Sequence, residues 1–592
     1  MENSGFLPVN KREMTEREWY YYDFLLITGD AYVDHPSFGA AVISRVLESK
    51  GYRVAVLSQP QNHIDLEKMG EPRLAVLITA GNIDSMVAHY SVSKNRRKKD
   101  SYTPGGKAGK RPDMATVVYT GYAKEAFPQK PVILGGLEAS LRRFAHYDYW
   151  KDAVLPSILT QSGADMLCFG MAETSICEIA MRLRRKKHIE DITDVRGTAY
   201  LTANPPKGEG VLELPSFDEI TDSKRAYAKF ANMVQQEQDH VRGRVLTQKQ
   251  EDGMHLVQTR PSVPLETEEL DKVYALPYMR TYHPSYEERG GVAAIEEVEN
   301  SIIHNRGCFG SCNFCALALH QGRYVTSRSH KSVLEEAQKI IDGPHFKGYI
   351  HDVGGPTANF RRPACKKQKT VGTCKDRQCL FPTPCPALDA DEKDYLELLT
   401  EIRQLKGVKK VFVRSGIRFD YMLADKSDAF FENLVKYHIS GQLKVAPEHI
   451  SPNVLYYMGK PKMEVYEAFC EKYKKLNQKF GKEQYLVPYL MSSHPGSTLN
   501  DAITLALYLK KNKIVPEQVQ DFYPTPGTLS TAMYYTGIDP RTMKPVYVEK
   551  TAEGKAMQRA LLQARNPKNR GLVVKALKKA KREDLIGRGG LL

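Results

Sequence analysis

The sequence lacks any long uninterrupted apolar run. Its apolar stretches stay well short of the ~18 residues that a membrane-spanning helix needs, so we expect no membrane partner. Residues 1–20 are polar and charged, which is not the pattern of a secretory signal. Charged residues make up only 26% of the chain and hydrophobic residues 42%, a balance that excludes wholesale disorder. We therefore expect a cytoplasmic protein, whose cysteines are metal ligands, catalytic thiols or core residues before they are disulfides.

Positive charge is in excess but unevenly placed. The 592 residues hold 85 Lys and Arg against 70 Asp and Glu, for a net charge of +15. Residues 541–592 and 94–111 are strongly basic. Such segments can steer an anionic partner, so RNA bound through the basic C-terminal tail is one predicted partner. Blocks of like charge are also typical of solvated loops and tails.

Short apolar runs alternate with helical segments in the first part of the chain. The runs cover residues 23–29, 52–58, 73–79, 130–136 and 164–170. This alternation is typical of an α/β fold with a doubly wound parallel sheet, which binds ligands at the carboxyl ends of its strands. We predict a Rossmann-like domain over 1–185 and a connecting region over 186–290, with one helix at 222–238.

A second alternation begins near residue 296. Its strand-like runs are 297–305, 347–355, 409–416, 441–449, 484–493 and 517–524, and its helical segments are 332–342, 391–406, 426–438, 464–480 and 498–513. Ser332 and Glu335 have the spacing of a capping box. Repeated β–α units predict a partial (β/α)6 barrel over 291–530, with function on the loops after the strands. Residues 531–592 are expected to form a basic extension that behaves as a mobile tail.

Three cysteines, Cys308, Cys312 and Cys315, directly follow the first strand of this barrel. Three thiolates leave one iron of a [4Fe–4S] cluster without a protein ligand, and a small chelating molecule can bind there. The alternative is a zinc knuckle, which needs a fourth ligand such as His304 or His320.

The loop GCFGSCNFC resembles the CxxxCxΦC signature of radical S-adenosylmethionine (SAM) enzymes, with Phe314 as the aromatic residue. The resemblance implies a [4Fe–4S] cluster whose open iron chelates SAM. It also implies reductive cleavage of SAM to a 5′-deoxyadenosyl radical, with an electron donor such as flavodoxin or ferredoxin.

Further matches follow in the expected order. Gly354 and Gly355 resemble the GGE motif that holds the SAM amine, although Pro356 replaces the glutamate. Arg414 and Arg418 follow the third strand, where either is suited to pair with the SAM carboxylate or to form a structural ion pair.

Two more positions follow the fourth and fifth strands. Glu448 in KVAPEH stands where this family holds the ribose hydroxyls, and Ser493 lies in the loop SSHPGST. With DHPSFG, PVILGGLEASLRR, RSGIR and FYPTPGT, these motifs resemble the YgiQ family of radical SAM proteins over residues 20–545. The resemblance implies architecture and cofactor but no substrate, so the catalytic residues are unknown.

A second group of cysteines lies in a predicted insert at 360–390. Four thiols within 21 residues indicate a metal-bound loop, but their spacing is not a standard zinc or ferredoxin pattern. An auxiliary iron–sulfur cluster, a structural zinc and free thiols all remain open. The group consists of Cys365, Cys374, Cys379 and Cys385, whereas Cys168, Cys177 and Cys470 have apolar surroundings typical of core residues.

The N-terminal domain resembles the cobalamin-binding fold that precedes many radical SAM barrels. Asp34 and His35 follow its first strand, but DHPSFG departs from the DxHxxG pattern of cobalamin ligation. We therefore expect this domain to contribute to substrate binding, with cobalamin unlikely as a cofactor.

The sequence thus predicts a radical SAM enzyme of unknown substrate. Two alternatives remain open: an RNA-modifying enzyme like the methylthiotransferases, and a non-enzymatic nucleic-acid-binding protein stabilised by zinc.

Overall fold

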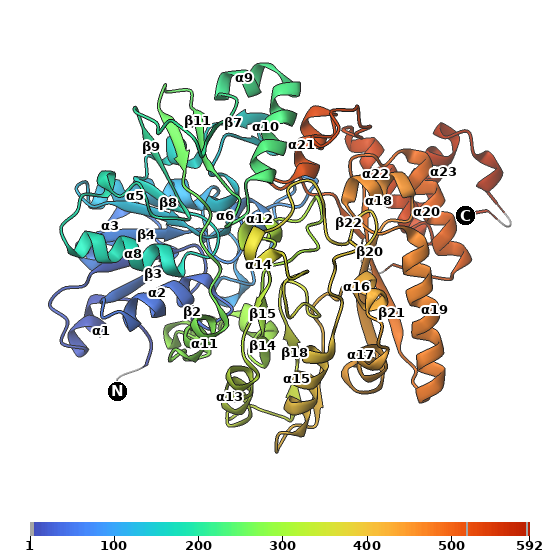
Figure 1. Ribbon diagram of the computed structural model, residues 1–592, viewed down its shortest axis with the longest axis horizontal. Helices are drawn as coiled ribbons and strands as arrows, with labels where there is room; N and C mark the ends of the chain where they lie inside the picture. Colours follow the sequence, from blue (N-terminus) through green and yellow to red (C-terminus); the bar gives the residue numbers. More distant parts are fainter. Residues whose placement is uncertain (1–4, 517–518, 588–589, 592) are drawn as a thin grey trace.

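The computed structural model describes residues 5–516, 519–587 and 590–591. A sheet domain from the N-terminal part (blue to green) lies beside a barrel (yellow to orange), and the C-terminal helices (red) cover the far side of the barrel (Figure 1). Within these described ranges, no helix combines the length and the apolar character needed to cross a membrane.

The sheet domain is built on nine strands in the order β10-β11-β12-β9-β8-β5-β4-β1-β3. Five predicted strands form its parallel half, which confirms the doubly wound sheet. Strand β1 is buried along its whole length, because helices cover both faces of the sheet. The parallel strands are β1 (Phe24–Thr28), β3 (Val54–Ser58), β4 (Ala75–Thr79), β5 (Val132–Gly135) and β8 (Met166–Cys168), and the helices beside them include α2 (Gly39–Ser49), α3 (His63–Met69), α5 (Ala115–Ala126) and α8 (Glu173–Arg184).

The predicted connecting region adds strands to this same sheet. Strand β9 pairs antiparallel with β8, and β12 and β11 continue the antiparallel ladder. The region also contains the helix α10 (Lys224–Gln236), close to its predicted bounds. Residues 186–290 therefore extend the sheet domain instead of merely linking two others. The added strands are β9 (Thr198–Thr202), β10 (Val211–Glu213), β11 (Val245–Lys249) and β12 (His255–Gln258).

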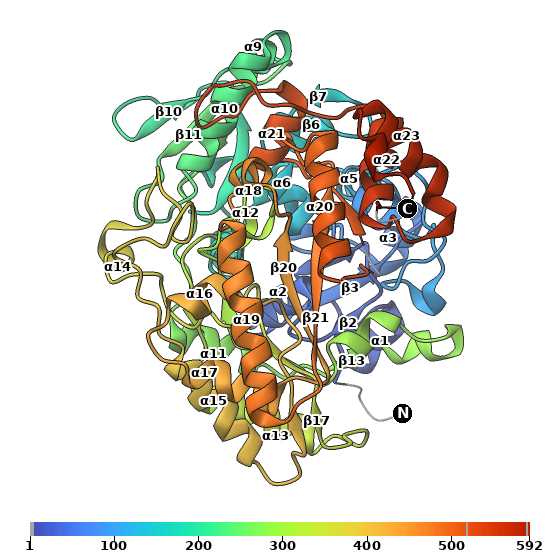
Figure 2. The ribbon, with the colours of Figure 1, turned by 90° about the vertical axis from the view of Figure 1, so that its right-hand side faces the viewer.

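The barrel is made of parallel strands that meet in three groups: β14 with β18, β17 with β19, and β20 with β21 and β22. The predicted partial barrel is confirmed, although the last predicted strand begins at residues 517–518, outside the described residues. Helices α19 and α20 run alongside β21 in Figure 2. The strands are β14 (Ser301–Ile303), β17 (Tyr349–Ile350), β18 (Asp352–Gly354), β19 (Lys410–Val411), β20 (Gln442–Glu448), β21 (Tyr485–Ser492) and β22 (Val519–Asp521), and the main helices are α13 (His330–Ile341), α15 (Lys393–Gln404), α19 (Met463–Phe480) and α20 (Leu499–Lys511).

The predicted capping box at Ser332 is wrong. Helix α13 begins at His330, and the hydroxyl of Ser329 accepts a hydrogen bond from the Ser332 backbone N–H at 3.1 Å. Asp271 accepts from the Ser329 hydroxyl at 2.5 Å. The N-cap is therefore three residues earlier, because a tertiary contact with Asp271 favours Ser329.

The predicted mobile tail is also wrong for the described residues. Helices α22 (Ala552–Leu562) and α23 (Arg570–Lys579) bury apolar side chains such as Leu561 and Leu577 against α20. Lysines make this segment basic. Its apolar side chains recur at helical spacing, so one side of each helix packs into a core.

Aromatic residues from the C-terminal part join the barrel to the sheet domain. Tyr535 of α21 (Leu529–Thr536) places its ring 4.7 Å from that of Tyr147 and 4.9 Å from that of Tyr227. The Tyr523 hydroxyl donates to the carbonyl of Met86 at 3.4 Å. The two bodies are thus joined at a second place, far along the chain from the direct connection near residue 300.

Candidate functional site

The cysteine loop begins at the end of β15 (Asn305–Arg306), which pairs antiparallel with β16 (Thr326–Ser327). This pairing closes the base of the loop. Gly307 has a φ of +82°, and a side chain there would overlap with the Tyr324 carbonyl. Helix α12 (Leu317–Gln321) follows Cys315 almost at once. The local structure therefore holds the three predicted cysteines on one short, closed loop.

The three thiols lie close together and have polar neighbours. Thr357 Oγ1 is 3.3 Å from Cys308 Sγ, and Arg418 Nη1 donates to Cys312 Sγ at 3.4 Å. Burial raises the pKa of the Cys315 thiol to about 12, and the charges of Cys312 and Cys308 raise it further. Thiolates here need a positive charge or a metal to be stable, and Arg418 supplies a positive charge in contact with Cys312.

Arg418, and not Arg414, reaches the cysteine loop. The Arg418 guanidinium is buried and forms two hydrogen bonds with the Asp420 carboxylate, from Nε at 2.8 Å and from Nη2 at 2.6 Å. The Arg414 side chain is exposed, and its backbone N–H donates to Asp352 Oδ1 at 2.7 Å. Both arginines lie in RSGIR, so the sequence alone did not distinguish them. A role for Arg414 in SAM binding stays a prediction.

Gly354 and Gly355 end β18 where the chain packs very closely. A side chain at Gly354 would overlap with the Ser415 hydroxyl, and one at Gly355 would overlap with the Asn305 amide oxygen. Asn305 Oδ1 is itself buried without a hydrogen-bond partner. Close packing within the protein therefore requires both glycines, whatever they contribute to a ligand.

Glu448 and Ser493 stand at the carboxyl ends of neighbouring parallel strands. Both have left-handed backbone conformations, with φ of +69° and +58°. Such conformations cost about 1–3 kcal/mol and cluster at ligand sites. The Ser493 hydroxyl is buried without a partner. Burial raises the pKa of Glu448, although the positive charges of Lys460 and Arg418 oppose the rise.

Phe314 packs against a histidine. Its ring lies 6.0 Å from the His494 ring in an edge-to-face arrangement, and His494 Nε2 is 2.7 Å from Ser530 Oγ. His494, Lys460, Asp420 and Thr357 were not predicted as site residues. His494 lies within the motif SSHPGST, so that motif was the signal for it.

The two histidines considered as zinc ligands are engaged elsewhere. His304 Nε2 is 2.8 Å from the Ala358 carbonyl, and His320 Nδ1 is 3.1 Å from Ser140 Oγ. Across the described part of the chain, no three His, Cys, Asp or Glu side chains stand close enough to hold one metal ion. An iron–sulfur cluster makes a different demand, because each thiolate binds a different iron. Three thiols on one loop, with Arg418 donating to one of them, fit a cluster that has an open iron.

Asp34 and His35 of the sheet domain lie in its interior. Asp34 forms a buried ion pair with Arg45, and His35 Nδ1 accepts from the Ser37 backbone N–H at 3.1 Å. Both side chains are fully buried. His35 Nε2 is buried without a hydrogen-bond partner, and the absence of cobalamin stays a prediction.

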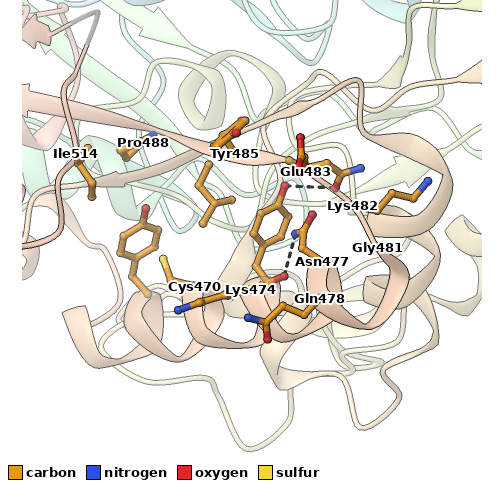
Figure 3. A pocket seen from close by; sticks show the side chains of 14 residues that line it. Cys470, Lys474, Asn477, Gln478, Gly481, Lys482, Glu483, Tyr485, Pro488 and Ile514 are labelled. Carbon is orange, nitrogen blue, oxygen red and sulfur yellow. Dashed lines mark hydrogen bonds between the residues drawn. The ribbon is translucent and has the colours of Figure 1, made fainter.

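A cavity of about 590 Å³ lies elsewhere, between α19 and β21. Figure 3 shows Asn477, Tyr485 and Pro488 along its walls. It contains no residue of the cysteine loop and none of the residues predicted to bind SAM.

Comparison with known proteins gives three family matches along the chain. Residues 6–301 match the family described as "Radical SAM N-terminal", and residues 302–509 match "Radical SAM superfamily". Residues 517–591 match a domain of unknown function, DUF3362. The first match includes strands β9–β12, in agreement with one continuous sheet domain.

Curated relatives match over the full length. A UPF0313 protein of Clostridium perfringens is 55% identical over 592 residues, which is all of this chain and 89% of the relative. A UPF0313 protein of Clostridium botulinum is 55% identical over 591 residues, 100% of this chain and 92% of the relative.

Two solved structures are similar at low sequence identity. The radical SAM methyltransferase TsrM from Kitasatospora setae, with cobalamin and a [4Fe-4S] cluster bound, is 14% identical with a TM-score of 0.47, covering 86% of this chain and 77% of TsrM. The cobalamin-dependent radical enzyme OxsB is 11% identical with a TM-score of 0.47, covering 96% of this chain and 63% of OxsB.

Proposed function

Because this chain belongs to the UPF0313 (YgiQ) family of radical SAM proteins, we propose that it binds a [4Fe–4S] cluster and SAM and generates a 5′-deoxyadenosyl radical. Cys308, Cys312 and Cys315 are the proposed cluster ligands. The observation that carries the proposal is the placement of these thiols on one closed loop, with Arg418 donating to Cys312 Sγ.

The chemistry that cluster and SAM supply in this superfamily is one-electron cleavage of the sulfonium, which gives methionine and a radical that removes a hydrogen atom from a substrate. The proposed role of this chain's own residues is to bind the cluster and to bind and orient SAM. Arg418, fixed by Asp420, places positive charge against the thiolates. Glu448 is proposed to accept hydrogen bonds from the ribose hydroxyls, and the Ser493 hydroxyl to pair with a polar group of SAM. The backbone of Gly354 and Gly355 is proposed to bind its amine.

The substrate and the partners are not identified by these residues. A low-potential donor such as flavodoxin or ferredoxin is the proposed source of the electron. The RNA partner and the cytoplasmic location stay predictions.

The test is an assay of SAM cleavage on the full chain. Protein loaded anaerobically with iron and sulfide is reduced with dithionite in the presence of SAM, and 5′-deoxyadenosine and methionine are measured. We expect both products in equal amounts, and a loss of at least 100-fold in the C308A/C312A/C315A variant. The matched control is Cys470→Ala, which removes a thiol on helix α19, away from this loop. Equal cleavage by the triple variant and the control would refute the proposal.

A further inference from the structure

The insert between β18 and α15 is an irregular segment held in place from outside. Its regular structure is a single short helix, α14 (Gln368–Val371). Arg323 donates to the carbonyls of Cys374 and Arg377, each at 2.7 Å. Asp239 of the sheet domain accepts from the Thr373 backbone N–H at 2.9 Å. Figure 2 shows α14 at the opposite edge of the molecule from α22 and α23.

Four cysteines of this insert gather around Cys379. Cys379 is buried, Cys365 and Cys385 are half-buried, and Cys374 is exposed. The Cys385 backbone N–H donates to the Cys379 carbonyl at 2.8 Å, and Gln368 Nε2 is 3.7 Å from Cys379 Sγ. The Gln368 backbone N–H also donates to the Cys365 carbonyl at 3.1 Å, so this one residue contacts two of the four cysteines. The fold thus brings together thiols that are spread over 21 residues.

Within the insert itself, few interactions fix its conformation. All four cysteines are free of disulfides. The apolar cluster that reaches the insert includes four of its buried side chains, Phe360, Ala364, Cys379 and Leu380. Segments with so small a core usually need a covalent or metal cross-link to keep one conformation.

Charge in the insert favours an anionic group. Residues 361–379 contain seven Lys and Arg and one Asp. The Arg323 guanidinium, bonded to two carbonyls of the insert, adds a further positive charge beside it. Three of the seven, Arg361, Arg362 and Lys375, already form ion pairs with carboxylates. An iron–sulfur cluster with four thiolate ligands carries negative charge, which the remaining four would balance.

A single zinc ion makes a stricter geometric demand on its ligands than a cluster does. Zinc needs its four sulfur ligands about 2.3 Å from a single point. In the described residues no three His, Cys, Asp or Glu side chains converge in that way. A cluster spreads its thiolates over several irons, so it needs the four thiols near one another but not at one point.

The insert also touches the first cysteine loop. Gln378 Nε2 donates to the Ser311 carbonyl at 2.6 Å and to Asn313 Oδ1 at 2.9 Å. Cys308 packs against the apolar cluster that contains Cys379. We propose that Cys365, Cys374, Cys379 and Cys385 bind a second iron–sulfur cluster beside the loop of Cys308, Cys312 and Cys315. This proposal does not depend on SAM cleavage.

The test counts metal in a chain that lacks the first site. The full-length C308A/C312A/C315A variant is reconstituted anaerobically with iron and sulfide and analysed for iron, sulfide and zinc. We expect about two to four irons per chain, with matching sulfide and a Mössbauer spectrum of a cluster. Adding C365A and C379A should remove that iron, whereas adding C177A, at a cysteine outside both groups, should leave it.

Two results would overturn the proposal. One is about one zinc per chain, with no iron, that disappears with C365A and C379A. The other is less than half an iron per chain in the triple variant. Because C365A/C379A changes buried packing, a Cys374→Ser change at the exposed cysteine is the second variant. It should keep the far-ultraviolet circular dichroism of the parent and lose at least half of the remaining iron, and unchanged iron in it would also refute four-thiolate ligation.

Discussion

Arg418 connects the cysteine loop to the rest of the barrel through one side chain. It donates to Cys312 Sγ and forms a bidentate pair with Asp420, and both charged groups are buried. A buried pair adds little net stability, because desolvation offsets the attraction. Removing one member is strongly destabilising, since the other charge stays buried without a partner.

Arg418→Ala should therefore lower the free energy of unfolding by about 3–5 kcal/mol, measured by anaerobic urea denaturation without SAM. The double variant R418A/D420A should recover part of this loss, because no unpaired charge remains. Arg414→Ala, at an exposed side chain, should stay within about 0.5 kcal/mol of the parent. A double variant that loses the full sum of both single effects would contradict this account.

Glu448 predicts a pH dependence of SAM binding. Its pKa is raised because burial outweighs the opposing charges of Lys460 and Arg418. The carboxylate is charged above this raised pKa, and hydrogen bonds from ribose hydroxyls favour the charged form. SAM affinity should therefore be complete above the raised pKa and fall as the pH drops through it.

The measurement is calorimetric titration of cluster-loaded protein with SAM from pH 8 down to pH 5. Glu448→Gln should weaken binding about 10- to 100-fold at pH 8 and flatten the pH profile. The exposed Glu471→Gln is the control and should keep the parent profile. A steep profile that survives in Glu448→Gln would assign the titration to another group.

Of the helices and strands, the sequence predicted best those whose apolar pattern depends only on burial. The run 23–29 predicted β1 (Phe24–Thr28) to within a residue at each end, because a strand covered on both faces must be apolar throughout. The spacing of Cys308, Cys312 and Cys315 also predicted that they share one loop, because the three residues lie close together in the sequence.

The missed elements depend on contacts between distant segments. Strand β10 (Val211–Glu213) is partly exposed and mixed in composition, so nothing in its own residues marked it as part of the sheet. The cap at Ser329 depends on Asp271, 58 residues away. The choice of Arg418 over Arg414 likewise needs the position of Asp420 relative to Cys312, which spacing does not give.

The end of β18 offers a test of the two glycines. Gly355→Ala should overlap with the Asn305 amide oxygen and destabilise the protein by about 1–3 kcal/mol, measured by thermal unfolding and iron content. Gly416→Ala is the matched control, because no atom lies within 4 Å of its added methyl group. It should be neutral or slightly stabilising. Equal stability of the two variants would show that the loop relaxes around Asn305.

At the scale of the whole molecule, the C-terminal helices are part of the core. Leu561 and Leu577 are buried with Ile503 of α20 in one apolar cluster. The basic charge of this segment is therefore carried on a folded surface.

Deleting residues 545–592 should expose the apolar side of α20 and lower the free energy of unfolding by about 2–5 kcal/mol. Denaturant unfolding and dye binding to apolar surface are the measurements. The control K578Q/K579Q/K581Q removes three exposed charges and should unfold like the parent. That variant, and not the deletion, is suited to a test of RNA binding against salt. A deletion that unfolds like the parent would show that the helices are dispensable.

The contact between Tyr523 and Met86 spans 437 residues of chain. The sheet domain is complete only at β12, which ends at Gln258, 277 residues before Tyr535. At a synthesis rate of about 5–20 residues per second, it is made ~14 to 55 s before its C-terminal partner exists. During that interval the rings of Tyr147, on which Tyr535 later stacks, and Tyr227, which it later meets edge to face, lack this partner. The newly made domain therefore spends tens of seconds with an uncovered aromatic surface, and a molecular chaperone that shields such surfaces would raise the yield of folded protein.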